Sequence, residues 1–131
     1  MISKAMYVEY LRGYAREGKA VALAESVEDP YALSPGGLGC GLMQQSAKWQ
    51  ETFPPLMEAL ANSFLFQHAM ATDHRWHPAY QLACYATFCY KGRLLDLATR
   101  LRLYHYGHEQ PEDPDDYVAR VMREWGELAS W

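Results

Sequence analysis

Apolar residues recur every third or fourth position along most of the chain, which is the spacing of one face of a helix. No stretch alternates apolar and polar residues long enough to indicate a strand, and no hairpin turn is recognisable. The sequence therefore predicts an all-α protein with about six or seven helices around one core. The expected helices cover residues 4–16, 20–25, 45–52, 54–72, 78–92, 94–104 and 114–128.

Glycine, proline and aspartate mark the expected ends of these helices. Gly18 is expected to stop the first helix, because glycine readily adopts the left-handed conformation found just beyond helix ends. Asp113 is the expected N-cap of the last helix, with Pro114 at its first position. The segment 78–92 is apolar on almost all sides, so we expect it to be the central helix of the core.

The length of 131 residues suits a single domain, which we expect to span residues 1–131. Half of the residues are apolar or aromatic, which argues against an intrinsically disordered chain. The net charge of -4 and the lack of a basic cluster argue against a nucleic-acid partner. The apolar run at residues 20–24 is too short to span a bilayer, and no stable membrane insertion is expected.

Cysteines and histidines offer little chemistry of their own. Cys84 and Cys89 would point away from each other on one helix, and with Cys40 they make an odd number, so we expect buried free thiols. Histidines stand three apart at 74 and 77 and again at 105 and 108, a spacing that two metal ligands can have. Neither pair has the H-E-x-x-H pattern, so we expect no metal and no cofactor.

Glu25 is the candidate for catalysis. It follows the apolar run and precedes a loop rich in proline, serine and glycine, so we expect it near the C-terminal end of a buried helix, facing a cleft. An apolar setting favours the protonated form of a carboxylic acid, which can donate a proton to a glycosidic oxygen. The pattern indicates an enzyme that cuts a sugar chain.

Three motifs follow one another in a specific order. Residues 25–44 begin with Glu-Ser, continue through Pro, Ala and Ser-Pro, and close with Gly-Leu-Met-Gln; residues 104–107 read Tyr-His-Tyr-Gly and residues 117–121 read Tyr-Val-Ala-Arg-Val. Together, over residues 18–125, they resemble the soluble lytic transglycosylase family and its goose-type lysozyme relatives. The second motif departs from that family's Tyr-Asn-Ala-Gly, with His105 in place of asparagine.

The resemblance implies a single lysozyme-like helical domain with a Gly/Pro-rich active-site loop. It implies cleavage of the β-1,4 bond between N-acetylmuramic acid and N-acetylglucosamine in the glycan strands of peptidoglycan. Glu25 would protonate the leaving oxygen and then, as base, take the proton of the C6 hydroxyl, so that a 1,6-anhydromuramoyl product forms. In lysozyme-type relatives water attacks instead, and Glu28 and Asp29 are the nearby carboxylates that would activate it.

Other positions around the acid follow from the same resemblance. A loop serine would bond near the N-acetyl group, a methionine and a glutamine would line the groove, and two tyrosines would lie by the acid and support it. Core packing is an equally weighted alternative for the methionine and the second tyrosine, and an ordinary turn is the alternative for the serine. The expected substrate-binding residues are Ser34, Met43, Gln44, Tyr104 and Tyr117.

Two other classes of protein stay open. One is a catalytically inactive lysozyme-fold protein that is either a virion structural component or a glycan-binding module, and the other is a cytoplasmic interaction domain whose tryptophans and tyrosines form a partner surface. The N-terminal segment lacks the unbroken apolar core of a signal peptide. The localisation is therefore left open. The expected routes to the cell wall are phage release, virion delivery and non-classical export, with a phage particle or a secretion apparatus as partner.

Overall fold

A computed structural model describes residues 16–26, 29, 31–33, 39–55, 74–107 and 112–129 of the chain. Over these residues the protein is helical and holds no strand longer than an isolated bridge, which confirms the predicted all-α class there. Antiparallel bridges join Leu33 to Cys40 and Cys40 to Gln45. The elements are helical residues 16–26, α2 (Ala47–Thr52), the short 3-10 helix η1 (His74–Trp76), α5 (Pro78–Lys91), α6 (Leu97–Tyr106) and α7 (Tyr117–Ala129).

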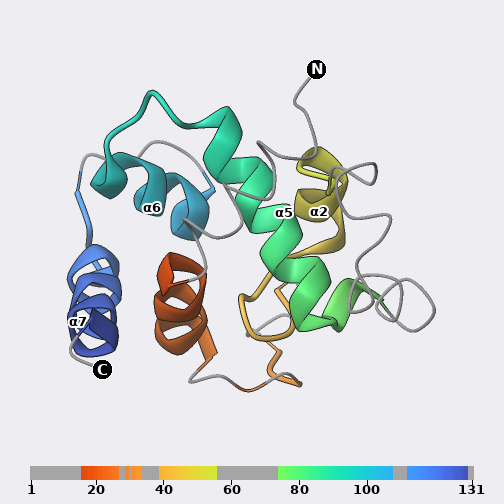
Figure 1. The fold of residues 1–131 in the computed structure, drawn as a ribbon, viewed down its shortest axis with the longest axis horizontal. Coiled ribbons are helices and arrows are strands. Elements are labelled where there is room, and N and C mark those ends of the chain that lie inside the picture. The colour runs from red at the N-terminus through yellow and green to blue at the C-terminus, as the bar shows by residue number, and fades with distance from the viewer. Residues whose placement is uncertain are drawn as a thin grey trace.

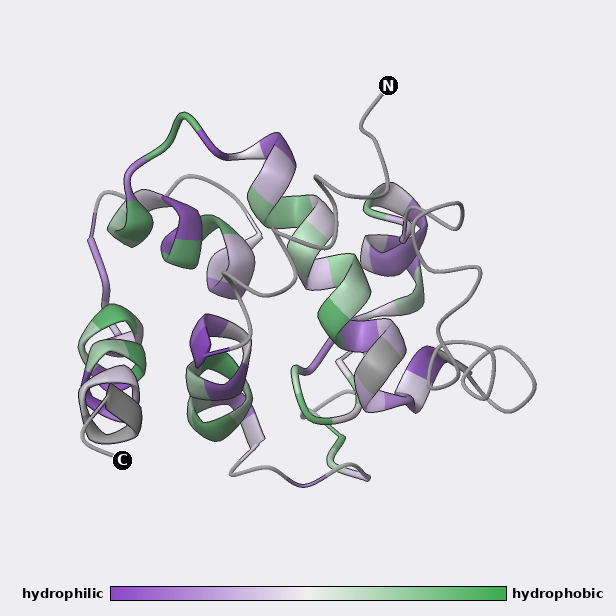
Figure 2. Ribbon diagram, in the orientation of Figure 1, coloured by the Kyte–Doolittle hydropathy of each residue, from purple (hydrophilic) through white to green (hydrophobic). Residues whose placement is uncertain are grey.

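Helix α5 is the centre of the described fold. In Figure 1 it runs through the middle of the molecule, with α2 on one side and α6, α7 and the helical residues 16–26 on the other. Tyr85, Ala86 and Cys89 in its middle are fully buried. Figure 2 shows mostly apolar and weakly polar residues along this helix, whereas α7 carries apolar and polar residues on different faces. The predicted central helix is thus confirmed, because its sequence is apolar on nearly every side.

Gly18 does not stop a helix. The helix continues unbroken through it from residue 16 to residue 26, so the predicted boundary is wrong. A Cβ at Gly18 would lie 2.5 Å from Cδ1 of Leu82 on α5, which is closer than non-bonded carbon atoms normally approach. Glycine is used here for close helix packing rather than for its backbone freedom. The predicted helix 4–16 lies outside the described residues apart from its last position.

A buried ion pair joins the helix of residues 16–26 to α6. One guanidinium nitrogen of Arg100 lies 2.7 Å from Oε1 of Glu17, and their side chains are only 9% and 2% exposed. The hydroxyl of Tyr85 on α5 donates to the same carboxylate oxygen at 2.7 Å. These contacts satisfy a charge that would otherwise be costly to bury, and they link three helices at one point.

Helices α6 and α7 both begin later than the apolar pattern predicts. Leu94 and Leu95 lie in the preceding turn and are 92% and 41% exposed, and α6 starts after its N-cap Asp96. Helix α7 starts at Tyr117, so Asp113 and Pro114 do not occupy the predicted N-cap and first positions. The periodic apolar residues at 94 and 95 cannot join the helix face because the N-cap fixes the first turn after them.

Asp113 nevertheless caps α7 from a distance. Its carboxylate accepts the backbone N–H of Tyr117 at 3.0 Å and that of Val118 at 2.8 Å, and it also accepts a hydrogen bond from the hydroxyl of Tyr106. These N–H groups belong to the first turn of the helix and have no partner within it.

At the C-terminal end of α6, Gly107 adopts φ 78, which confirms the predicted interruption there.

The remaining predicted elements are confirmed in part. Helix α2 ends at Thr52 as expected and begins after the N-cap Ser46, whose side chain accepts the N–H of Trp49. The predicted helix 54–72 lies outside the described residues except for Pro54 and Pro55, which are not helical. No helix within the described part of the chain is long and apolar enough to cross a bilayer.

The three cysteines are free and buried, as predicted. Burial raises the pKa of the Cys84 thiol to about 12, and burial together with the nearby Glu17 carboxylate raises the pKa of Cys89 as well. Both groups therefore stay protonated near neutral pH and are unsuited to act as nucleophiles.

Candidate active site

Glu25 lies at the C-terminal end of the helix of residues 16–26, with its side chain only 11% exposed. Its Oε1 is 3.1 Å from Nδ1 of His105 on α6, eighty positions further along the chain. The acid is therefore shielded, as the apolar run predicts, but it is not alone. An imidazole faces it at hydrogen-bonding distance, and which atom donates depends on the tautomer of the ring.

His105 is held from three sides. Its ring stacks on Tyr117 of α7, with centroids 4.0 Å apart and planes 5° from parallel. Its other nitrogen, Nε2, lies 3.5 Å from Oδ2 of Asp115 in the segment before α7. Burial by itself would lower the pKa of His105, but the hydrogen bond and charge of Glu25, followed by the hydrogen bond to Asp115, raise it above its ordinary value. The protonated ring is thus favoured in this position.

Ser26 fastens the end of this helix to the following loop. Its Oγ lies 2.7 Å from the carbonyl oxygen of Leu42 and 3.1 Å from that of Ala22. A hydroxyl carries one proton, so the shorter contact to Leu42 is the stronger hydrogen bond. The same Oγ accepts the N–H of Asp29 at 3.2 Å. The residue next to Glu25 therefore sets where the loop crosses the helix end.

Gln81 of α5 anchors the Gly-Leu-Met-Gln loop through its side-chain amide. Its Oε1 accepts the N–H of Met43 at 2.8 Å, and its Nε2 donates to the carbonyl of Cys40 at 2.8 Å. Gly41 has φ +76 and a Cβ there would collide with this amide. Nothing local in the sequence marks Gln81 as a loop anchor, since it is one polar position within an apolar helix.

The predicted groove residues fall into two groups. Gln44 adopts φ 53, donates to the carbonyls of Gly41 at 2.9 Å and Ala32 at 3.1 Å, and lines a pocket. Met43 is buried in the hydrophobic core and does not line that pocket, which is the alternative given for it above. Ser34 lies outside the described residues, as does Glu28.

The two predicted tyrosines both lie near the acid. The hydroxyl of Tyr104 donates to the carbonyl of Met43 at 2.6 Å. The hydroxyl of Tyr117 is buried close to Glu25 but meets no partner at hydrogen-bonding geometry among the described residues. Burial first, and then the charge of Glu25, raise the pKa of both tyrosines well above its ordinary value. Both hydroxyls therefore stay protonated near neutral pH and are unsuited to act as bases.

An open pocket of about 330 Å³ adjoins this cluster. Its lining includes Gln44, Trp49, Tyr104 and His105, so aromatic faces and an amide surround the space. Glu25 itself does not line this pocket, although the sequence predicts that it faces a cleft; its partner His105 does line it. A second pocket of about 500 Å³, more apolar in its walls, shares Trp49 and two other residues with the first.

His105 is the functional candidate that the sequence pattern misses. In the sequence it stands where the lytic transglycosylase motif has asparagine, and its spacing from His108 is one that two metal ligands can have. In the structure its partners are instead Glu25 and Asp115, two carboxylates from other segments. Among the described residues there is no group of three or more histidine, cysteine, aspartate or glutamate side chains arranged to hold a metal ion. A carboxylate and an imidazole at this distance can exchange a proton.

No protein-family model, no curated protein and no solved structure matches this chain. The resemblance to the lytic transglycosylases therefore rests on the ordered motifs themselves.

Proposed function

We propose that this protein has a lysozyme-like fold and cleaves the glycan strands of peptidoglycan at the β-1,4 bond between N-acetylmuramic acid and N-acetylglucosamine. The observation that carries the proposal is the position of Glu25. Its carboxyl group is shielded from solvent at a helix end, contacts an imidazole and lies next to an open pocket. These are features that support proton donation to a glycosidic oxygen.

The walls of the adjoining pocket suit a saccharide. Sugar rings present apolar faces to aromatic side chains and hydroxyl groups to amides, and the pocket offers Trp49 and Tyr104 for the first and Gln44 for the second. The second pocket, which continues past Trp49, would extend the same surface to further sugar units. A chain of several sugars is therefore a better match than a single small molecule.

The proposed reaction uses Glu25 twice. As an acid it protonates the leaving oxygen while the bond to C1 breaks, and the substrate's own N-acetyl group stabilises the positive centre. As a base it then takes the proton of the C6 hydroxyl, whose oxygen bonds to C1 to give the 1,6-anhydro sugar. No water is consumed.

Digestion of purified murein sacculi tests this function. We expect the wild-type protein to release anhydro-muropeptides, identified by mass, and Glu25→Gln to release at least about a hundredfold less, because it keeps the size of the side chain but removes the proton donor. Glu51→Gln, the same change at an exposed position of α2, is the matched control and should keep full activity. Activity of Glu25→Gln close to that of the control would remove Glu25 from the mechanism.

A catalytically inactive virion structural or glycan-binding protein is the second candidate. One observation favours it: the carboxylate of Glu25 already has an imidazole partner, and Glu25 does not line the pocket. On this reading folded protein would sediment with sacculi without releasing any muropeptide at any pH tested. Reducing sugar ends instead of anhydro ends would indicate hydrolysis and leave the site assignment in place.

A further inference from the structure

We propose that His105 stores the proton that Glu25 delivers, so that these two side chains hold one catalytic proton in common. This inference rests on the proposed cleavage of glycan strands and adds to it a positioning residue that acts through Glu25. The resemblance gives no reason to expect it, because the corresponding family motif has asparagine, which cannot carry an exchangeable charge.

The distance and the shielding support a shared proton. Nδ1 of His105 and Oε1 of Glu25 are 3.1 Å apart, and the two side chains are 22% and 11% exposed. An ionised carboxylate with an imidazolium and a carboxylic acid with a neutral imidazole contain the same number of protons and have the same net charge. Little solvent has to rearrange when the proton moves from one form to the other at such a site.

The surroundings of His105 decide which nitrogen exchanges its proton. Nε2 lies 3.5 Å from Oδ2 of Asp115, so a proton stays on Nε2 and Nδ1 is left to face Glu25. The parallel stack on Tyr117 fixes the plane of the ring. The tautomer that results after Nδ1 gives up its proton is therefore the one already held by Asp115.

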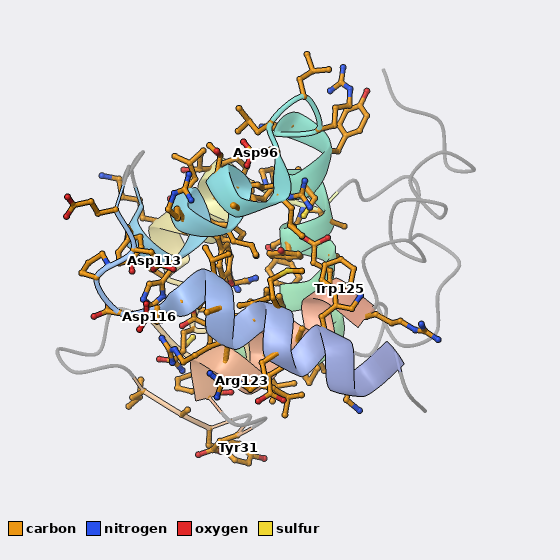
Figure 3. The ribbon with its side chains drawn as sticks, turned by 90° about the vertical axis from the view of Figure 1, so that its left-hand side faces the viewer. Tyr31, Asp96, Asp113, Asp116, Arg123 and Trp125 are labelled. Atoms are coloured by element: carbon orange, nitrogen blue, oxygen red, sulfur yellow. The ribbon has the colours of Figure 1, made fainter. Side chains whose placement is uncertain are left out.

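Charges from every neighbouring segment bear on the ring. Asp115 and Asp113 are acidic and come from the segment before α7, while Arg120 of α7 is basic and opposes the protonated ring. Figure 3 shows Asp113 and Asp116 at the N-terminal end of α7. Tyr106, next to His105 on α6, has its hydroxyl bound to Asp113. Acidic groups outnumber basic ones around the ring, which favours the imidazolium.

The proton balance closes over the two steps. The proton on Nδ1 passes to Glu25 and from there to the glycosidic oxygen as the C1–O bond breaks, leaving neutral His105, ionised Glu25 and a positive sugar centre. The C6 oxygen then bonds to C1, and its proton passes to Glu25 and back to Nδ1. Net charge is conserved in both steps, and the pair ends as it began.

The pair loses its common proton when the pH rises through the raised pKa of His105. Cleavage should therefore persist above pH 6.5, the ordinary value for histidine, before it falls. With asparagine in place of His105, no imidazole is left to pass a proton to Glu25. The alkaline limit of activity should then move to lower pH.

The pH profile of anhydro-muropeptide release tests this directly. We expect His105→Asn to move the alkaline limit down by about one pH unit or more, with about tenfold less activity than wild type near pH 7.5. Asp115→Asn should move it in the same direction by less, and it also serves if His105→Asn fails to fold, since Asp115 is 60% exposed. Asp116→Asn is the matched control, because it removes one charge from the residue adjacent to Asp115. Asp116 has φ 51, a conformation that asparagine tolerates, and the alkaline limit of activity should stay unchanged.

Nuclear magnetic resonance titration of His105 supplies a readout besides activity. The imidazole signals missing from the His105→Asn spectrum identify the residue, and in wild type they should titrate at higher pH than in Glu25→Gln. Equal titration in both proteins would disprove the common proton. An unchanged pH limit in His105→Asn would overturn the inference while the cleavage proposal stands, whereas absence of cleavage by wild type at every pH would overturn the function and with it the delivery of the proton.

Discussion

Replacing Glu17 with leucine is expected to destabilise the protein by about 3–5 kcal/mol, because it leaves the guanidinium of Arg100 buried without its countercharge. The pair is almost completely withdrawn from water, with side chains 2% and 9% exposed and a separation of 2.7 Å. The carboxylate oxygen also accepts from Tyr85 and lies 3.7 Å from the thiol of Cys89. One substitution therefore removes the partner of three polar groups.

The size of this loss is large relative to the whole. Domains of this size are stable by roughly 5–15 kcal/mol, so the change would remove about a fifth or more of the total free energy of unfolding. At a few degrees per kcal/mol, the melting temperature should fall by roughly 10 °C or more. Arg100→Met alone should cost a similar amount of stability, because it leaves the carboxylate of Glu17 buried without its countercharge.

The double variant Glu17→Leu/Arg100→Met separates a charge effect from a packing effect. Without either charge, the remaining cost is that of the unpaired Tyr85 hydroxyl, about 1–3 kcal/mol. Urea denaturation of all four proteins, followed by circular dichroism, gives the coupling free energy. If the two single losses added up in the double variant, or if Glu17→Leu cost less than about 1 kcal/mol, the account of this cluster as a buried ion pair would be wrong.

Three further predictions follow from single contacts. The pKa of His105 is raised in the folded state, so its contribution to stability is complete below pH 6.5 and is lost as the pH rises through the folded-state pKa. His105→Asn should therefore destabilise the protein more at about pH 5 than at about pH 9 in urea denaturation. Equal losses at both pH values would contradict this. Ser26→Ala removes the 2.7 Å hydrogen bond to the loop and should cost about 1 kcal/mol in the same assay, together with part of the proposed cleavage activity; an unchanged midpoint would mean that the loop is held elsewhere. Gly41→Ala should cost about 1–2 kcal/mol or more because its φ of +76 is left-handed and Gln81 occupies the space, whereas the control Gly126→Ala, with open space on α7, should be neutral or stabilising; similar midpoints for both would refute the strain.

Much of the helical framework could be predicted because its signals are local. The apolar segment of α5 marks the core helix, Gly107 ends α6 in the left-handed conformation, and the apolar run before Glu25 places that acid at a shielded helix end. Each of these depends on residues within a few positions of one another. Side-chain periodicity and the conformational preference of glycine act at that range whatever the rest of the chain does.

The roles of Gly18 and His105 were decided by the tertiary structure. Gly18 is a typical helix-stop residue but lies inside a helix, where Leu82, more than sixty positions away, occupies the space that a Cβ would fill. His105 reads as a departure from a motif, and only the packing of α6 against the end of the first described helix turns it into the partner of Glu25. Contacts between distant segments depend on how helices cross, which one helix period does not encode. The sequence by itself thus determined the helical class of the described residues and the shielded position of Glu25, and the fold determined which side chain faces it.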